Sequence, residues 1–65
     1  MSDALDALVA QLRTIEESLR DLAYDRLEAA AGGDERAASD EKRLHQARRA
    51  VERAIHALAS GADGA

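Results

Sequence analysis

The chain of 65 residues contains no cysteine, no proline, no phenylalanine and no tryptophan. Without cysteine it forms neither disulfides nor thiolate metal sites, and nothing points to an oxidising compartment. It also lacks the run of about 18 apolar residues that a membrane span requires, and its N-terminus is acidic where a signal peptide is basic. These absences predict a cytoplasmic protein that does not enter a membrane.

The overall charge and composition narrow the class further. The net charge of −4 disfavours contact with a phosphate backbone, so we expect no nucleic-acid partner. Alanine, leucine, arginine and glutamate dominate the chain, which is typical of long helices or a coiled coil. Arginine outnumbers lysine eight to one beside abundant alanine, which indicates a GC-rich bacterial source.

The first half of the chain carries an apolar row at helical spacing, which we call the leucine row. Its members follow one another at steps of three and four residues: Leu5, Leu8, Leu12, Ile15, Leu19 and Leu22. In heptad notation Leu5, Leu12 and Leu19 take a-type positions, and Leu8, Ile15 and Leu22 take d-type positions. This pattern predicts a helix that packs lengthwise against another helix.

Local signals divide the chain into two helices. We expect Gly32 to end the first helix in the left-handed conformation and Asp34 to cap the second. Ser39 is an alternative cap, which would leave residues 35–38 as a separate turn. The predicted single domain is therefore a helix over 3–31, a loop over 32–34, a helix over 35–60 and a disordered tail over 61–65.

The second helix carries a matching apolar stripe. Its members are Leu44, Ala47, Val51, Ala54, Ile55 and Leu58. Folding the chain at Gly33 brings the two stripes together, with Ile15 facing Val51 and Leu22 facing Leu44. Residues 1–31 carry a net charge of −4 and residues 35–60 a net charge of +2, which favours side-by-side packing. The predicted fold class is all-α, a coiled-coil-like antiparallel two-helix hairpin.

The two helices offer unequal apolar surfaces. The first has eight large aliphatic residues and the second has four, so one hairpin would leave part of the leucine row exposed to solvent. A small chain without disulfides or metal commonly gains the missing burial by oligomerisation. We therefore expect a homodimer that forms a four-helix bundle with the first helix central, the orientation of the hairpins being open. The expected core and dimer contacts are Leu5, Leu8, Leu12, Ile15, Leu19, Leu22, Leu44, Val51, Ile55 and Leu58.

Two residues near the loop depart from the pattern. Arg26 occupies the a-type position after Leu22, and we expect it to face Asp40 and Glu41 in an ion pair that fixes the register. The alternative role for Arg26 is contact with an anion or a nucleotide. Tyr24 is the only aromatic residue, and it is either a dimer contact, an isolated surface tyrosine or part of a partner-binding patch.

One flank of the second helix combines acids, histidines and arginine at helical spacing: Glu41, His45, Arg48, Glu52 and His56. Its two Glu-x-x-x-His pairs differ from the Glu-x-x-His pairs of di-iron bundles, so ion pairs between neighbouring turns are the preferred interpretation and a metal site is the least favoured. We expect no catalytic residue and no cofactor. A basic stripe also runs along this helix, formed by Lys42, Gln46, Arg49 and Arg53, and it is either solvated or docks to an acidic partner.

This flank resembles the helical-hairpin anti-sigma factors, which bind cyclic di-GMP through a repeated Glu-x-x-x-Ser-x-x-Arg-x-x-x-Gln-x-x-x-Asp motif. Glu41 and Arg48 match two of the five motif positions on the second helix, whereas His45, Glu52 and His56 depart from it. On the first helix only Arg26 matches, because Leu19 and Ala23 stand in the Glu and Ser positions. The resemblance implies a ligand-responsive regulator in which Arg26 and Arg48 contact the nucleotide.

Taken without that resemblance, the residues favour a different function. They predict a small non-enzymatic interaction protein that dimerises and presents charged outer faces to a protein partner. Tyr24, Arg26 and Arg48 are the candidate contacts to a partner or ligand.

Overall fold

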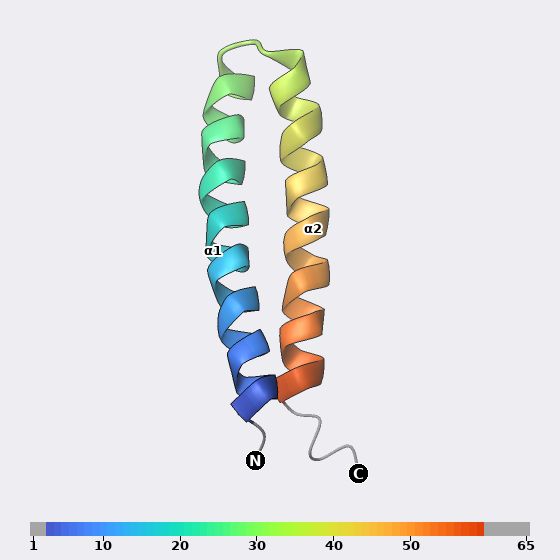
Figure 1. Cartoon of the computed structure of the whole chain (residues 1–65). Coiled ribbons are helices and arrows are strands. Elements are labelled where there is room, and N and C mark those ends of the chain that lie inside the picture. Colours follow the sequence, from blue (N-terminus) through green and yellow to red (C-terminus); the bar gives the residue numbers. More distant parts are fainter. Residues whose placement is uncertain (1–2, 60–65) are drawn as a thin grey trace.

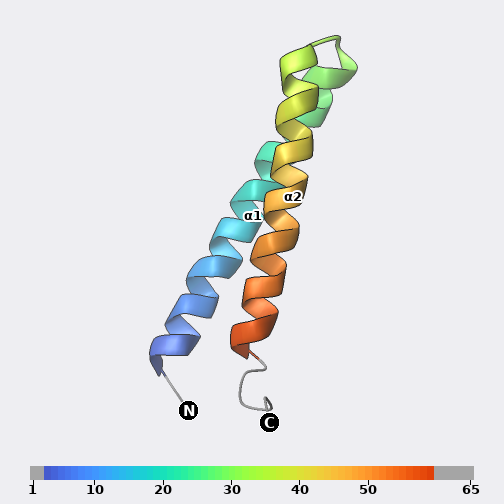
Figure 2. The ribbon, with the colours of Figure 1, turned by 90° about the vertical axis from the view of Figure 1, so that its right-hand side faces the viewer.

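The computed structural model describes residues 3–59, which form two antiparallel helices joined by a short loop (Figure 1). Helix α1 spans Asp3–Ala31 and helix α2 spans Glu35–Ala59. The helices pack against each other along their length and cross at a small angle (Figure 2), in a rod 48 Å long. The predicted all-helical hairpin is confirmed. The expected tail, residues 61–65, lies outside the described residues.

Neither helix has the length and apolar character needed to cross a membrane, as far as the described residues extend. Both begin with acidic residues in the first turn, where the partial positive charge of the helix dipole favours them: Asp3 and Asp6 in α1 and Glu35 in α2. The start of each helix is thus encoded locally.

The loop between the helices is held by a set of backbone hydrogen bonds. The Gly33 N–H donates to the Ala30 carbonyl at 3.0 Å and the Asp34 N–H donates to the Ala29 carbonyl at 3.1 Å. This pair of bonds is the Schellman arrangement that ends many helices, and it requires a left-handed residue at its centre. That residue is Gly33, with φ of 105°. The prediction that Gly32 takes this role is wrong by one residue, because the Gly32 N–H still donates to the carbonyls of Glu28 and Ala29 in the helical manner and the positive φ falls at Gly33.

Asp34 then starts α2 as predicted. Its Oδ1 accepts a hydrogen bond from the Ala37 N–H at 3.1 Å, which satisfies one of the free donors of the first turn. Since α2 already begins at Glu35, Ser39 is not its cap. The loop therefore closes within three residues, which sets the two helices side by side.

Replacing Gly33 with alanine is expected to lower the free energy of unfolding by about 1–2 kcal/mol, because an L side chain is strained at a positive φ. Gly32→Ala is the matched control. A Cβ at Gly32 would meet the Ala29 carbonyl oxygen at 3.4 Å, an ordinary contact, so this variant should be neutral or slightly more stable. Urea unfolding followed by circular dichroism measures both. Equal effects of the two substitutions would contradict the assignment of Gly33 as the left-handed residue.

The contact between the helices is thin. Of the described residues, those that are buried are Ala23, Ala37 and Ile55. Around them lies a half-buried shell: Val9, Leu12, Glu16, Leu19, Arg26, Ala29 and Ala30 from α1, and Asp40, Glu41, Leu44, Ala47, Arg48, Val51, Ala54 and Leu58 from α2. On α1 the most covered positions thus recur at 12, 16, 19, 23 and 26, which combines the a-type positions with the e-type positions beside them.

The other side of the leucine row is left uncovered. Leu8 and Ile15 are each 48% exposed and Leu22 is 50% exposed, so α2 covers these d-type residues only in part. The reason is geometric, because a and d positions together span a wide arc of the helix, and a single alanine-rich helix covers only one edge of it. Leu5, at the open end, is also exposed. The expectation that one hairpin leaves the leucine row partly exposed to solvent is confirmed.

Candidate interaction surfaces

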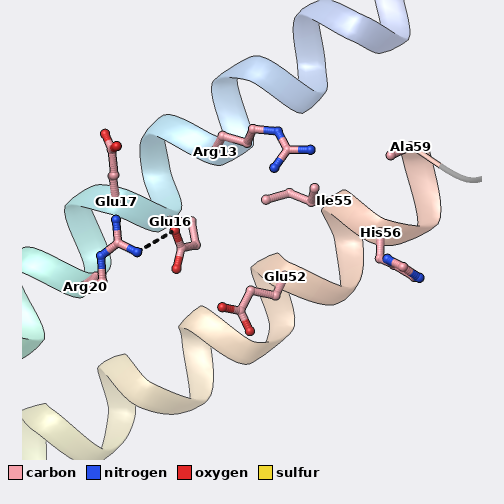
Figure 3. A pocket seen from close by; sticks show the side chains of 8 residues that line it. All are labelled: Arg13, Glu16, Glu17, Arg20, Glu52, Ile55, His56 and Ala59. Atoms are coloured by element: carbon pink, nitrogen blue, oxygen red, sulfur yellow. Dashed lines mark ion pairs between the residues drawn. The ribbon is translucent and has the colours of Figure 1, made fainter.

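Two grooves run between the helices, one on each side of the hairpin. The first, which we call the charged groove, is lined by Glu16 and Arg20 of α1 and by Glu52 and Ile55 of α2 (Figure 3). The second, the apolar groove, is lined by Leu22, Arg26, Asp40, Arg43, Leu44 and Ala47. The two sets share no residue, and the charged groove lies toward the open end of the hairpin whereas the apolar groove lies toward the loop.

A cross-helix ion pair closes the charged groove near the middle of the rod. Both Nε and Nη2 of Arg48 donate to Glu16 Oε2 at 3.3 Å, and the side chains are only 25% and 15% exposed. Arg20 lies 3.8 Å from the other carboxylate oxygen of Glu16, and Glu52 lies 3.9 Å from Arg48. The four charges alternate in sign, so the cluster neutralises itself and fixes the register of the helices.

Removing one partner of the Glu16–Arg48 pair is expected to cost about 1 kcal/mol of unfolding free energy, since the pair is partly desolvated and joined by two hydrogen bonds. A double-mutant cycle with Glu16→Ala and Arg48→Ala should give a coupling energy of about 0.5–1 kcal/mol. Arg49→Ala, at the neighbouring exposed position, is the control and should change stability by less than about 0.5 kcal/mol. A coupling energy of zero would show that the contact adds no stability.

Sequence reasoning missed Glu16 as a structural residue. Glu16 and Arg48 carry opposite charges and lie about equally far from the loop. This charge complementarity between facing positions of the two helices is the signal that could have identified the pair. Arg48 itself was assigned to a solvated flank with i,i+4 pairs, of which the Arg48–Glu52 pair is present. The stronger interaction is the one that crosses to α1.

Arg26 lies at the loop end of the apolar groove. Its Nη2 donates to Asp25 Oδ2 at 2.8 Å, so the ion pair shown is with its chain neighbour and not with the expected Asp40 or Glu41. Asp40 nevertheless lines the same groove. The hydrogen bond from Arg26 to Asp25, together with the charges of Asp25, Asp34 and Asp40, raises the pKa of Arg26. Its guanidinium therefore stays charged at any pH at which the protein folds.

Arg26 carries one unmet donor. Its Nε is buried and has no hydrogen-bond partner among the described residues. A buried N–H without an acceptor costs free energy, and an acceptor supplied from outside the hairpin would recover it.

The two arginines implied by the anti-sigma resemblance are far apart in the hairpin. Arg48 is bonded to Glu16, which lies ten residues before Arg26 on α1, or about 15 Å along the helix axis. Arg26 borders the apolar groove, whereas Glu16 lines the charged groove. The two arginines therefore lie at different heights of the hairpin and beside different grooves.

The outer faces of the hairpin are exposed and mixed in character. Tyr24 is 67% exposed and Leu27 is 50% exposed, on the side of α1 that faces away from the apolar groove. On α2 the exposed residues Lys42, His45, Gln46 and Arg49 line a shallow surface depression together with Glu41. Within the described part of the chain, no group of three or more acidic, histidine or cysteine side chains is arranged to hold a metal ion.

Comparison with known proteins adds no further evidence to this geometry. No family model matches the chain, and the comparisons with curated proteins and with solved structures found no match. The surfaces of the hairpin itself are therefore what indicates its function.

Proposed function

We propose that this chain is a small non-enzymatic interaction protein that works as a homodimer of helical hairpins. The observation that carries the proposal is the exposed row formed by Leu8, Ile15 and Leu22, each about half exposed along one side of the rod. Three large aliphatic side chains in line form an apolar strip of the kind that marks an interaction surface. Burying them in a four-helix bundle would supply the core that one hairpin lacks.

The ion pairs of the charged groove support a non-enzymatic role. The carboxylate of Glu16 contacts Arg48 and Arg20, and Arg48 also approaches Glu52. These ionisable groups hold the helices together and are occupied by one another. The outer faces, with Tyr24 and Leu27 on α1 and the basic stripe on α2, are left to present to a protein partner in the cytoplasm.

Sedimentation equilibrium on the intact chain at micromolar concentration tests the proposal. We expect a mass of twice the chain's 6.9 kDa and a helical circular dichroism spectrum at the same concentration. Dilution should lower the mass and the helical signal together, since folding and association are then linked. A folded chain that stays monomeric over the whole concentration range would overturn the proposal.

A further inference from the structure

We infer that the second copy docks on the apolar-groove side of the hairpin with both loops at the same end, so that each α1 packs against α2 of the other copy. This inference rests on the proposed homodimer and adds its geometry. The two-fold axis would then run parallel to the helices. The alternative is an axis across the helices, which would place α1 on α1 and α2 on α2 with the loops at opposite ends.

The net charges of the two helices favour the arrangement with the loops together. Helix α1 has seven acidic and three basic residues, a net charge of −4, and α2 has six basic and four acidic residues, a net charge of +2. With the loops together, each acidic α1 lies beside a basic α2. With the loops apart, like-charged helices are adjacent, which is unfavourable across an interface. In this arrangement α1 is not central, which differs from the expectation drawn from the sequence.

Each helix has an exposed edge next to the proposed interface. On α1 this edge is formed by Gln11, Ser18 and Asp25, each of which lies three residues after a member of the exposed row. On α2 the corresponding edge is formed by Arg43, Ala50 and Ala57, which lie about one helical turn from Ala47 or Ala54. These side chains are all exposed, and Arg36, also exposed, continues the α2 edge toward the loop. Asp25 and Arg43 are the charged residues at matching heights on the two edges.

The position of those two charged residues distinguishes the arrangements. Leu22 and Leu44 line the same groove, which fixes the relative height of the helices and puts Asp25 within about 3 Å of Arg43 along the rod axis. With the loops together, Asp25 therefore meets Arg43 of the second copy, and Ser18 meets Ala50. With the loops apart and the edges in register, Arg43 would lie beside Ala57 of the second copy and gain no opposite charge.

The sizes of the side chains also favour contact between α1 of one copy and α2 of the other. Large exposed residues stand on α1, namely Leu8, Ile15 and Leu22, whereas the facing edge of α2 has alanines at 47, 50, 54 and 57. Packing large against small lets two helices approach and interdigitate. Contact between α1 and α1 would instead oppose large residues with large ones, and contact between α2 and α2 would leave alanines facing alanines.

Disulfide trapping tests the geometry, because the chain has no cysteine of its own. Ser18→Cys and Ala50→Cys are made as separate chains and are then mixed in a glutathione redox buffer. The mixed disulfide between the two variants should be the main product, and each variant alone should give little disulfide dimer, since a bridge needs Cβ atoms about 4 Å apart. Intact mass distinguishes the mixed from the self-paired products. Tyr24→Cys mixed with Ala50→Cys is the matched control and should give none.

Each outcome bears on a different claim. Self-paired disulfides of Ser18→Cys and of Ala50→Cys would establish the arrangement with loops apart and overturn the inference, as would a dimer that forms none of these disulfides. Sedimentation of the reduced variants separates this failure from that of the proposed function. A dimer with the wrong cross-links contradicts only the geometry, whereas a folded monomer contradicts the homodimer itself.

Discussion

Replacing Ile55 with alanine is expected to lower the free energy of unfolding by about 2–4 kcal/mol, the usual cost of removing a large aliphatic side chain from a core. Ile55 is the only large residue that is buried within the described residues, where it is 9% exposed. Its side chain points from α2 toward α1, below the Arg13 side chain (Figure 3). A chain of this size rarely has more than about 3–5 kcal/mol of stability, so the variant should lose most of its helical signal at room temperature.

Thermal and urea unfolding followed by circular dichroism measure this effect. Leu27→Ala is the control, because Leu27 is 50% exposed on the opposite side of α1 from the apolar groove. It should change stability by less than about 0.5 kcal/mol. If Ile55→Ala unfolded at the same urea concentration as the parent chain, the helices could not be packing through Ile55 as described.

The hairpin itself was predictable because its signals are local and agree with one another. Two stripes at helical spacing flank Gly32 and Gly33, and Asp34 follows as a cap that the structure confirms through its bond to Ala37. A fold can be predicted from the sequence when its local patterns agree with the overall arrangement of the helices, as they do here. The one-residue error at the turn arose because either glycine satisfies the pattern, and only the hydrogen bonds to Ala29 and Ala30 decide between them.

The face of α1 that α2 covers was not predictable from the apolar pattern. In the leucine row Leu12 and Ile15 are equivalent, yet in the structure Leu12 is more deeply covered than Ile15, which is 48% exposed. The choice depends on residues that the pattern ignores. Ala23 and Ala37 let the helices approach near the loop, and Glu16 is held against α2 by Arg48. Small residues and a charge pair thus rotate α1, and they leave the d-type leucines for another contact.

The site residues show the same limit. Arg26 was correctly seen as an exception in the row, but its partner is the adjacent Asp25 and not a residue of α2. A sequence pattern places residues on faces, whereas the choice among several nearby carboxylates depends on side-chain rotamers. The groove beside Arg26, with Asp40 and Arg43, could therefore not be foreseen from spacing alone.

Replacing Ile15 with aspartate is expected to raise the dissociation constant of the homodimer by at least about 100-fold. Ile15 is the middle member of the exposed row, and in the proposed dimer each copy buries one such side chain. Full burial of an aliphatic side chain is worth about 1.5–3 kcal/mol, and Ile15 has only about half of its surface left to bury. The loss from two copies is therefore about 1.5–3 kcal/mol, where each 1.4 kcal/mol is a factor of ten. A buried carboxylate without a partner adds to this cost.

Tyr24→Asp is the matched control, since it places the same charge on the same helix at a position 67% exposed and on the opposite side from Leu22. Its dimer should sediment like that of the parent chain, because the aspartate stays in water. If instead Tyr24→Asp dissociated the dimer and Ile15→Asp did not, the Tyr24 face would be the contact between copies, and the exposed row would remain open for another protein. The pair of variants therefore decides which side of α1 faces the second copy.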